Sequence, residues 1–254
     1  MALDETILEH ACAGEAPPTL RLYDWQPPCL SLGYAQPAAD VDRGRLAVLG
    51  WDLVRRPTGG RAILHTDEVT YAIIAPAWHP DLRGGVLESY RRLSGGLVAA
   101  LGQLGIAVDA PQVEPLAAGD RSNPVCFEAP SAYEITVSGY KLIGSAQVRR
   151  RGGILQHGTL PLRGDLGRIC LALRYPDDVA RTQAQARVLG RAATLERLLG
   201  HRVSWDQAAG ALQLGFHEAL GWEFEMGELL ESETERALEL EHTRFGSASW
   251  TDRV

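Results

Sequence analysis

Residues 124–161 decide the fold, and most of this stretch reads Tyr133-Glu-Ile-Thr-Val-Ser-Gly-Tyr-Lys-Leu-Ile-Gly-Ser-Ala-Gln-Val-Arg-Arg-Arg-Gly-Gly-Ile-Leu-Gln-His-Gly-Thr-Leu-Pro161. Apolar and polar residues alternate from residue 133 to residue 137, which is the period of a half-buried strand. Ser138-Gly139 and Gly152-Gly153 are tight-turn signals that separate this segment from two further extended ones. The stretch therefore predicts three short antiparallel strands, over residues 133–137, 140–148 and 154–160.

Outside this stretch, segments with strand periodicity and segments with helix periodicity follow one another. Strands are expected over 19–25, 29–34, 51–55, 62–65 and 69–75. Amphipathic helices are expected over 1–13, 38–49, 86–104, 166–173, 179–189, 192–199, 205–220 and 226–241. This order predicts one α+β domain over residues 1–254, a mainly antiparallel sheet packed with helices, in which residues 163–254 are a mostly helical C-terminal part.

The composition is that of an ordinary globular protein. The chain has 254 residues, of which 45% are hydrophobic and 22% charged, and its formal net charge is −7. The negative charge argues against general nucleic-acid binding. No segment approaches the roughly 20 apolar residues that cross a bilayer, and the acidic N-terminus lacks the apolar run of a signal peptide. We therefore expect a cytoplasmic protein that binds neither nucleic acid nor membrane.

The four cysteines, Cys12, Cys29, Cys126 and Cys170, lie far apart and form no CxxC pair. A zinc ribbon or a disulfide framework is therefore not expected. The histidines do not have the spacing of metal ligands, so no metal site is expected either. A reducing cytoplasm would keep a reactive thiol free.

Lys141 lies inside an otherwise mostly apolar strand and is followed closely by the small residues Gly144, Ser145 and Ala146. A lysine on a half-exposed strand commonly points to solvent. Small residues in a strand, however, often mark the close approach of a ligand or of another backbone. The combination favours a pocket for an acyl group, with the ammonium directed at the carbonyl.

Cys126 has two interpretations. A lone cysteine commonly packs as a small apolar residue, but this one lies between Pro124 and Pro130 in irregular backbone, where functional residues concentrate. Half-ionisation of a thiol at neutral pH needs about 2 kcal/mol, and an ammonium about 4 Å away supplies about 4 kcal/mol at an effective dielectric of 20. The hairpin turn places Lys141 opposite Thr136, so the thiol reaches the amine only if its own segment bends back.

The double-glycine loop that contains Gly59 and Gly60 also has two interpretations. Its backbone N–H groups could approach an anion or a carbonyl, with positive charge from Arg55, Arg56 and Arg61. The alternative is a hairpin turn with solvated arginines. The loop lacks the Gly-Lys-Ser/Thr of a phosphate-binding Walker loop.

Two histidines and an arginine run are open in the same way. His65 and His157 are each expected in a strand, where a lone histidine is more often a hydrogen-bonded structural group than a catalyst. Arg149-Arg150-Arg151 is either a solvated turn or a basic cluster that steers an acidic protein partner.

Three stretches together resemble the biotin/lipoate protein ligase and octanoyltransferase family. They are Arg55-Arg-Pro-Thr-Gly-Gly-Arg-Ala-Ile-Leu-His65, Gly139-Tyr-Lys-Leu-Ile-Gly-Ser-Ala-Gln147 and Leu155-Gln-His-Gly-Thr159. Ser31-Leu-Gly-Tyr34 and the tail from Arg244 to Trp250 fit as well, so the resemblance spans most of the chain.

Two details resemble one subgroup of that family. Lipoate ligases usually have a third glycine where Arg61 stands, and they lack the pattern Cys126-Phe-Glu-Ala-Pro-Ser-Ala-Tyr-Glu134 upstream of the lysine. Both features are similar to the octanoyltransferases whose nucleophilic cysteine precedes the lysine. The resemblance implies the family's catalytic fold, in which Cys126 and Lys141 are catalytic.

The resemblance also implies a substrate-binding set and a chemistry. The set consists of Arg56, Thr58, Gly59, Gly60, Arg61, His65, Gly144, Ser145, Ala146, Gln147, His157 and Gly158. Cys126 would take the octanoyl group from octanoyl-acyl carrier protein and pass it to the lysine of a lipoyl domain or of the glycine-cleavage H protein. Thioester to amide is downhill, so neither ATP nor another cofactor is expected. A monomer is expected.

Two other functions remain open from the sequence. One is an ATP-dependent lipoate–protein ligase in which Cys126 merely packs. The other is a non-catalytic member of the family that binds an acyl group or a lipoyl domain.

Overall fold

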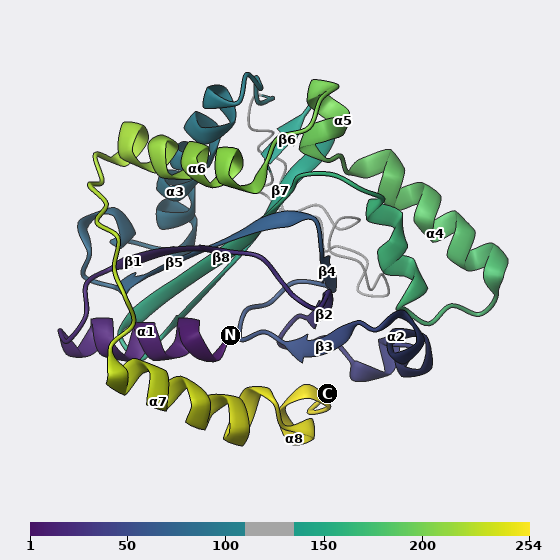
Figure 1. Ribbon diagram of the computed structural model, residues 1–254, viewed down its shortest axis with the longest axis horizontal. Helices are drawn as coiled ribbons and strands as arrows, with labels where there is room; N and C mark the ends of the chain where they lie inside the picture. The colour runs from purple at the N-terminus through teal and green to yellow at the C-terminus, as the bar shows by residue number, and fades with distance from the viewer. Residues whose placement is uncertain (110–134) are drawn as a thin grey trace.

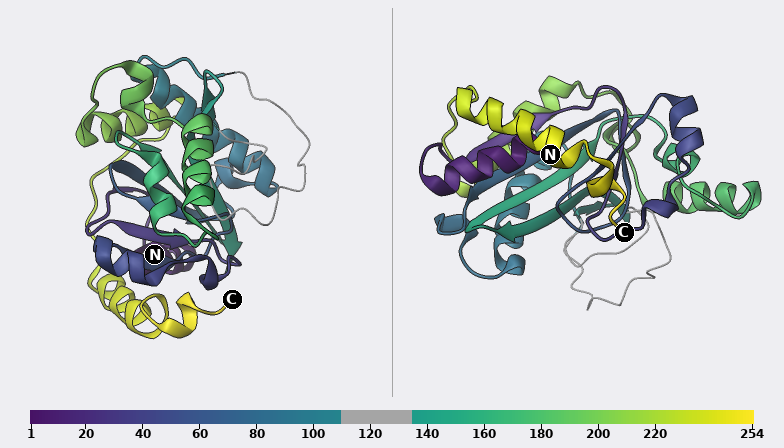
Figure 2. Two further views of the ribbon diagram at one scale, coloured as in Figure 1. Left: turned by 90° about the vertical axis from the view of Figure 1, so that its right-hand side faces the viewer. Right: turned by 90° about the horizontal axis from the view of Figure 1, so that it is seen from below.

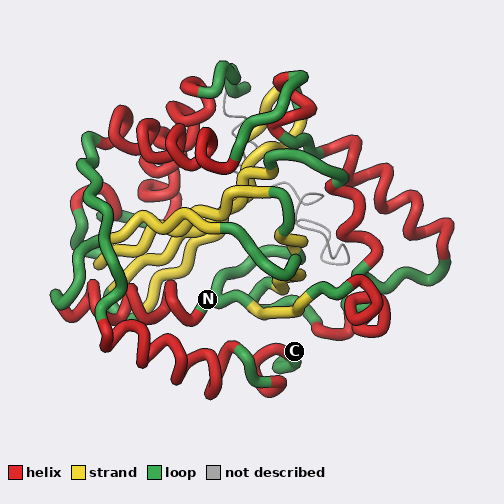
Figure 3. The backbone as a smooth tube through the Cα atoms, viewed as in Figure 1, coloured by secondary structure: helices red, strands yellow, loops and turns green. Residues whose placement is uncertain are grey.

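The computed structural model describes residues 1–109 and 135–254, and its centre is a five-stranded antiparallel sheet (Figures 1 and 3). The strand order is β1-β5-β8-β7-β6. The strands are β1 (Thr19–Tyr23), β5 (Glu68–Pro76), β8 (Gly153–Pro161), β7 (Tyr140–Arg150) and β6 (Ile135–Val137). The predicted meander is confirmed, because β6, β7 and β8 pair in sequence order as antiparallel neighbours.

Both hairpin turns use two residues with positive φ, as type I′ turns require. Ser138 and Gly139 have φ of 52° and 78°, and Arg151 and Gly152 have φ of 50° and 78°. The second turn thus lies one residue earlier than predicted. Gly153 is already part of β8, and a Cβ there would lie only 2.5 Å from a Leu8 methyl carbon.

A second sheet has three strands in the order β3-β2-β4. Its strands are β2 (Cys29–Leu32), β3 (Asp52–Arg55) and β4 (Ile63–His65). β2 pairs with β4 antiparallel and with β3 parallel, which is the one departure from antiparallel pairing among the named strands. A separate apolar cluster joins this sheet to α2 (Arg43–Leu49), α4 (Asp178–Arg191) and the 3₁₀ helix η4 (Leu166–Leu171).

The helices cover the large sheet on both faces (Figures 1 and 2). α3 (Val86–Gln103) and α6 (Trp205–Leu220) pack against each other and over one face. α1 (Ala2–Ala13) lies against β5 and β8 on the other face, and α7 (Glu231–Leu240) packs on the far side of α1. The side chains on the two faces of the large sheet therefore pack into two separate cores, one on each side of the sheet.

Several predicted helices differ from the observed ones. The segment 38–49 divides into η1 (Ala38–Asp40) and α2, because Asp42 caps α2 by accepting from the N–H of Arg45. The segment 192–199 becomes helical only in α5 (Leu195–Leu199), since Ala192 forms a bridge with β7. Residues 221–230 are irregular, so the last predicted helix begins five residues late; after α7 come the π-helical η5 (Glu241–Phe245) and α8 (Ala248–Thr251).

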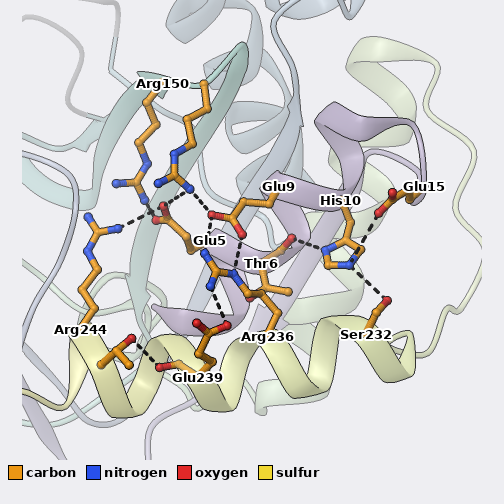
Figure 4. Close-up of polar contacts among 12 residues, drawn as sticks. Glu5, Thr6, Glu9, His10, Glu15, Arg150, Ser232, Arg236, Glu239 and Arg244 are labelled. Carbon is orange, nitrogen blue, oxygen red and sulfur yellow. Dashed lines mark hydrogen bonds and ion pairs between the residues drawn. The ribbon is translucent and has the colours of Figure 1, made fainter.

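An ion-pair network fastens α1 to α7 and to the end of β7 (Figure 4). The buried carboxylate of Glu5 pairs with Arg150 and Arg244, and Glu9 pairs with Arg236 at 2.9 Å. Arg151 also pairs with Glu9. N- and C-terminal segments are thereby held together on one side of the large sheet.

This network changes the interpretation of the arginine run 149–151. Arg149 donates to the carbonyls of Leu82, Gly84 and Gly85 in the segment before α3. Arg150 and Arg151 are in the Glu5–Glu9 network. Arg149 and Arg150 therefore have structural roles, whereas Arg151 lies in the turn and stays 59% exposed while it pairs with Glu9.

The contact between α3 and α6 depends on a glycine. A Cβ on Gly215 would lie 2.3 Å from the Ala100 nitrogen and 2.4 Å from the Gly96 oxygen. Both are backbone atoms, so the helices would have to separate to admit a methyl group. Gly210, in the same helix, has no neighbour within 4 Å of its Cβ position.

Alanine at these two positions should have opposite effects. Gly215→Ala is expected to lower the free energy of unfolding by about 1–3 kcal/mol through overpacking. Gly210→Ala should raise it by about 0.5–1 kcal/mol, because alanine favours a helix interior over glycine. Urea unfolding of both variants tests the pair, and equal stabilisation by the two alanines would contradict the close approach.

Candidate active site

An open cavity of about 440 Å³ lies where the large sheet meets the small sheet and the loop that follows β3. Most of the predicted substrate-binding residues line it. The lining residues are Met1, Tyr23, Trp25, Arg56, Gly59, Gly60, Ile63, His65, Thr70, Gly144, Ser145, Ala146, His157, Gly158 and Thr159.

The floor of the cavity is formed by β7 and β8 where these strands lack bulky side chains. Gly144 pairs with Thr159, and Ser145 pairs with Gly158. A Cβ on Gly158 would lie 2.6 Å from the Gly144 carbonyl oxygen and 2.6 Å from the Tyr71 ring. Glycine is therefore required here for the strands and Tyr71 to approach as closely as they do.

Lys141 is buried, with 5% of its surface exposed, so the solvent-facing interpretation is wrong. It stands opposite Thr136, as the hairpin predicted, and its carbonyl accepts from the Ala193 N–H at 3.1 Å. Its side chain passes over Gly144, where a Cβ would be 3.4 Å from Cε and 3.9 Å from Nζ. Cε and Nζ of Lys141 thus lie in van der Waals contact with the Cβ position of Gly144, which lines the cavity.

This position also holds the only lysine of the chain, whereas the other 24 of its 25 cationic side chains are arginine. An ammonium is a compact point charge, and a guanidinium is a wide planar fork. The cation beside Gly144 is therefore the compact one.

Arg55 and Arg56, at the start of the double-glycine loop, are buried and hold neighbouring backbone segments together by hydrogen bonds. Arg55 is fully buried and donates to the carbonyls of Gly33, Gln36 and Thr251. Arg56 donates to the hydroxyl and carbonyl of Ser31 and to the loop carbonyls of Gly59 and Arg61. The loop is neither a simple hairpin turn nor a ring of solvated charges.

A buried carboxylate organises one end of the cavity. Glu68 accepts from His65 Nδ1 at 2.7 Å, from Thr70 Oγ1 at 2.5 Å and from Thr159 Oγ1. Burial alone would raise the pKa of Glu68, but the charge of His65 and these three hydrogen bonds outweigh it and leave the pKa below its usual value. On the other side of the ring, His65 Nε2 lies 2.8 Å from the Ser31 hydroxyl.

His157 is buried beside the loop, and its Nε2 lies 2.6 Å from the Thr58 hydroxyl. Burial lowers the pKa of His157 to about 3, so the ring is neutral at neutral pH. A neutral imidazole with a hydroxyl partner is a hydrogen-bonded group that holds the loop to β8. It also presents a ring face to the cavity.

Three predicted binding residues do not line the cavity. Thr58 is buried behind it, against His157. Arg61 contributes its carbonyl to Arg56. Gln147 contacts Ser89 and Gln156 and accepts from Arg149, on the α3 side of the sheet.

Cys126 lies outside the residues that the structure describes. The other three cysteines are free, and two have a pKa above the ordinary value. Burial, helped by the charge of Asp52, raises the pKa of Cys29 to about 12, and burial also raises that of Cys12. Neither is therefore an activated thiol.

The sequence interpretation missed the residues that enclose the far end of the cavity. Trp25 stacks on His65 with 4.4 Å between ring centroids and donates to Thr70 Oγ1 at 2.9 Å. Glu68 had a signal that could have been used, since it is the only charged residue of the otherwise uncharged, fully buried β5. Trp25 had none, because it lies in a proline-rich segment beyond β1.

Within residues 1–109 and 135–254, no group of three or more His, Cys, Asp or Glu side chains could hold a metal ion. In the same residues, every helix is too short or too polar to cross a membrane.

The chain is similar to known proteins over its whole length. The family model described as the lipoyl protein ligase A/B catalytic domain matches residues 1–217. Octanoyltransferase LipM of Kyrpidia tusciae is 45% identical over 94% of this chain and 89% of its own. Octanoyltransferase LipM of Symbiobacterium thermophilum is 40% identical over 100% of this chain and 93% of its own.

Solved structures have the same fold. A bipartite lipoate protein ligase of Thermoplasma acidophilum, described with its E2 lipoyl domain, superposes with a TM-score of 0.82 at 24% identity, over 99% of this chain and 89% of that one. A T. acidophilum lipoate protein ligase with bound lipoic acid gives 0.80 at 25% identity, over 100% and 92%. The expected α+β fold, with its mainly antiparallel sheet, is thereby confirmed.

The neutral state of His157 predicts a pH dependence of stability. An unfolded histidine binds a proton near pH 6.5, whereas folded His157 binds one only near pH 3. Below pH 6.5 the unfolded state therefore holds more protons, and stability falls as pH falls, by about 2 kcal/mol between pH 7.5 and pH 5.0 from this group. Urea unfolding at both pH values should show this loss reduced by about that amount in His157→Gln.

His217→Gln, at a half-exposed position on α6, is the matched control and should leave the pH dependence as in the wild type. An unaltered pH dependence in His157→Gln would mean that His157 is not held neutral by the fold.

Proposed function

The chain belongs to the lipoyl protein ligase A/B catalytic domain family, and we propose that it is an octanoyltransferase that works through a Cys126 thioester. Octanoyl transfer in protein lipoylation is the function supported by full-length relatives that are 36–45% identical. The observation that carries the catalytic assignment is the buried Lys141 side chain, which contacts Gly144, a residue that lines the cavity. The donor we propose is octanoyl-acyl carrier protein. The acceptor is a lipoyl domain or the glycine-cleavage H protein.

Acylation of the enzyme is the first step. The Cys126 thiolate adds to the carbonyl carbon of the octanoyl thioester and forms a tetrahedral oxyanion. The Lys141 ammonium stabilises that negative charge. The bond to the carrier sulfur then breaks, the carrier thiolate leaves and takes up a proton, and the octanoyl group remains on Cys126 as a thioester.

Transfer to the acceptor is the second step. The acceptor lysine must lose its proton before its amine can attack the Cys126 thioester. The nitrogen gives up a second proton to solvent, and collapse of the second oxyanion breaks the C–S bond, releases the Cys126 thiolate and leaves an amide. Because an amide is more stable than a thioester, the reaction proceeds without ATP.

An ATP-dependent ligase is the less favoured alternative. A ligase starts from a free acid, which must be activated before an amine can attack it. The solved ligases share the fold at 24–25% identity, whereas the relatives matched at 36–45% are octanoyltransferases. A purely binding role is also less favoured, because the full-length relatives matched at 36–45% identity are octanoyltransferases.

The acyl-enzyme is directly testable. Incubation of the protein with octanoyl-acyl carrier protein, without ATP, should add the mass of one octanoyl group to the peptide that contains Cys126. Cys126→Ser should lower transfer to a lipoyl domain by about 10³-fold or more, as expected for loss of a nucleophile.

Cys12→Ser, the matched control, should keep both labelling and transfer, since the pKa of Cys12 is raised by burial. Full transfer by Cys126→Ser would refute the thioester. Labelling that requires ATP and free octanoate would instead support a ligase, and no transfer under either condition would support a binder.

Lys141 should not be replaceable even by arginine. Lys141→Arg and Lys141→Met are each expected to lower kcat/KM for acylation by about 10²-fold or more, through loss of a positioned charge. In Lys141→Met, the midpoint of the acylation pH profile should rise toward about 8.5, where a free thiol ionises.

Arg202→Gln is the control for a general charge effect, because its side chain is exposed on the surface. An unchanged pH midpoint in Lys141→Met would separate Lys141 from thiol activation.

A further inference from the structure

The strand that carries Lys141 is irregular at this residue. Lys141 on β7 pairs with Thr136 on β6, but the next pair is Ile143 with Ile135, so Leu142 is an extra residue in β7. An extra residue in one strand of an antiparallel pair is a β-bulge, and it interrupts the alternation of side chains between the two faces of the sheet. The bulge therefore determines to which face Lys141 points.

The side chains around the bulge show the change of face. Leu142 and Ile143 are consecutive and would lie on opposite faces of a regular strand, yet both are buried in the core that contains α3 and α6. Lys141 and Gly144 are three residues apart, yet Lys141 Cε lies 3.4 Å from the Cβ position of Gly144. A regular strand would place Leu142 beside Gly144 and turn Lys141 to the core. The bulge thus brings Lys141 to the face that Gly144 occupies.

The backbone of Lys141 is held from the other edge of β7. The pairs between β7 and β8 run from Gly144 to Arg150, so they do not reach Lys141. In place of β8, Lys141 forms a parallel bridge with Ala192, and the Ala193 N–H donates to the Lys141 carbonyl at 3.1 Å. The connection between α4 and α5 therefore fixes the peptide at which the bulge begins.

Arg197 on α5 fastens this connection to β7. Its Nη1 donates to the carbonyls of Leu189 at 2.9 Å and of Ala192 at 3.4 Å. Its guanidinium also lies over the ring of Tyr140, 4.3 Å from the centroid. A cation over an aromatic face is attracted to it. One side chain therefore joins Ala192 to the residue that precedes Lys141.

We propose that Arg197 and the backbone N–H of Ala193 are positioning groups for acyl transfer, because they hold the bulge that directs Lys141 to the cavity face of the sheet. This inference rests on the proposed acyl transfer. Neither Arg197 nor Ala193 is among the residues that line the cavity. Both therefore act on the reaction through Lys141 and not through contact with the acyl group.

The position of Lys141 can be measured without the reaction. Lys141 is the only lysine of the chain, so an amine-reactive reagent found on a lysine by peptide mass spectrometry reports on this residue alone. Burial should make its modification slow in the wild type. Arg197→Gln, and Ala193→Pro, which removes the N–H, should each raise the rate by about threefold or more, since a lost local contact favours local opening.

The same two variants should be impaired in the reaction. Each is expected to lower kcat/KM for acylation by octanoyl-acyl carrier protein by about tenfold or more, because a displacement of about 1 Å can cost up to about 10²-fold. A residue that only stabilised the fold would shift the urea midpoint but leave both rates unchanged in the folded protein. The rates are therefore compared without denaturant, on variants that circular dichroism shows to be folded.

Arg202→Gln and Ala193→Gly are the matched controls. Arg202 is an arginine just beyond α5, exposed and paired with Glu196, and it has no printed contact with β7. Ala193→Gly keeps the backbone N–H that Ala193→Pro removes. Both controls should modify Lys141 and undergo acylation at the wild-type rates.

The outcomes separate this inference from the proposed function. If wild-type protein is acylated and both test variants keep the wild-type rates, the positioning role is refuted and the transferase stands. Faster modification of Lys141 with unchanged acylation would also refute it. If wild-type protein is not acylated, the proposed function fails and the role in the reaction with it, whereas the modification rates still show whether Arg197 holds Lys141. Should Ala193→Pro fail to fold, the exposed Arg197 decides the question alone.

Discussion

The buried guanidinium of Arg55 is the constraint on which the binding loop depends. It is fully buried and donates hydrogen bonds to the backbone carbonyls of Gly33, Tyr34, Gln36 and Thr251. A buried charge must have such partners, because desolvation is otherwise too costly. One side chain therefore fixes the turn after β2, the start of the loop and the C-terminal segment relative to one another.

A chain of hydrogen-bonded contacts leads from the residue next to Arg55 to the cavity. This residue, Arg56, donates to Ser31, Ser31 contacts His65, and His65 donates to Glu68. This chain of contacts joins the guanidinium of Arg56 to the buried carboxylate of Glu68 through Ser31 and His65. It holds the loop against one wall of the cavity and the threonines against the other, so the site is formed before any ligand arrives. A preformed site avoids the cost of ordering its walls on binding.

The sequence predicted best where local pattern and long-range packing agree. The meander was predicted because period-2 alternation and tight-turn residues coincide, and Lys141 lies opposite Thr136 as expected. Prediction failed where a distant contact decides the conformation. Gly153 extends β8 because α1 lies against it, and Ala192 leaves a helix to bridge Lys141.

The difference between local sequence pattern and distant contacts also explains which residues of the site could be predicted and which could not. The glycine, histidine and lysine positions carry recognisable motifs, and most of them line one cavity. Trp25 and Glu68 carry none, because their roles come from partners on other strands. The arginine run 149–151 misled for the related reason that its acidic partners, Glu5 and Glu9, lie more than 140 residues away in sequence.

A shared fold with ligases at TM-scores near 0.8 means that the fold does not by itself choose between the two chemistries. The described residues provide a cavity lined by Gly144, with the Lys141 side chain in contact with that glycine, and either chemistry could use this arrangement. What differs is the source of the free energy that makes the carbonyl reactive. In a ligase it comes from a nucleotide, and in a transferase it arrives with the thioester. A thiol that can hold the acyl group between two carriers is therefore the smallest change that would convert the one use of this fold into the other.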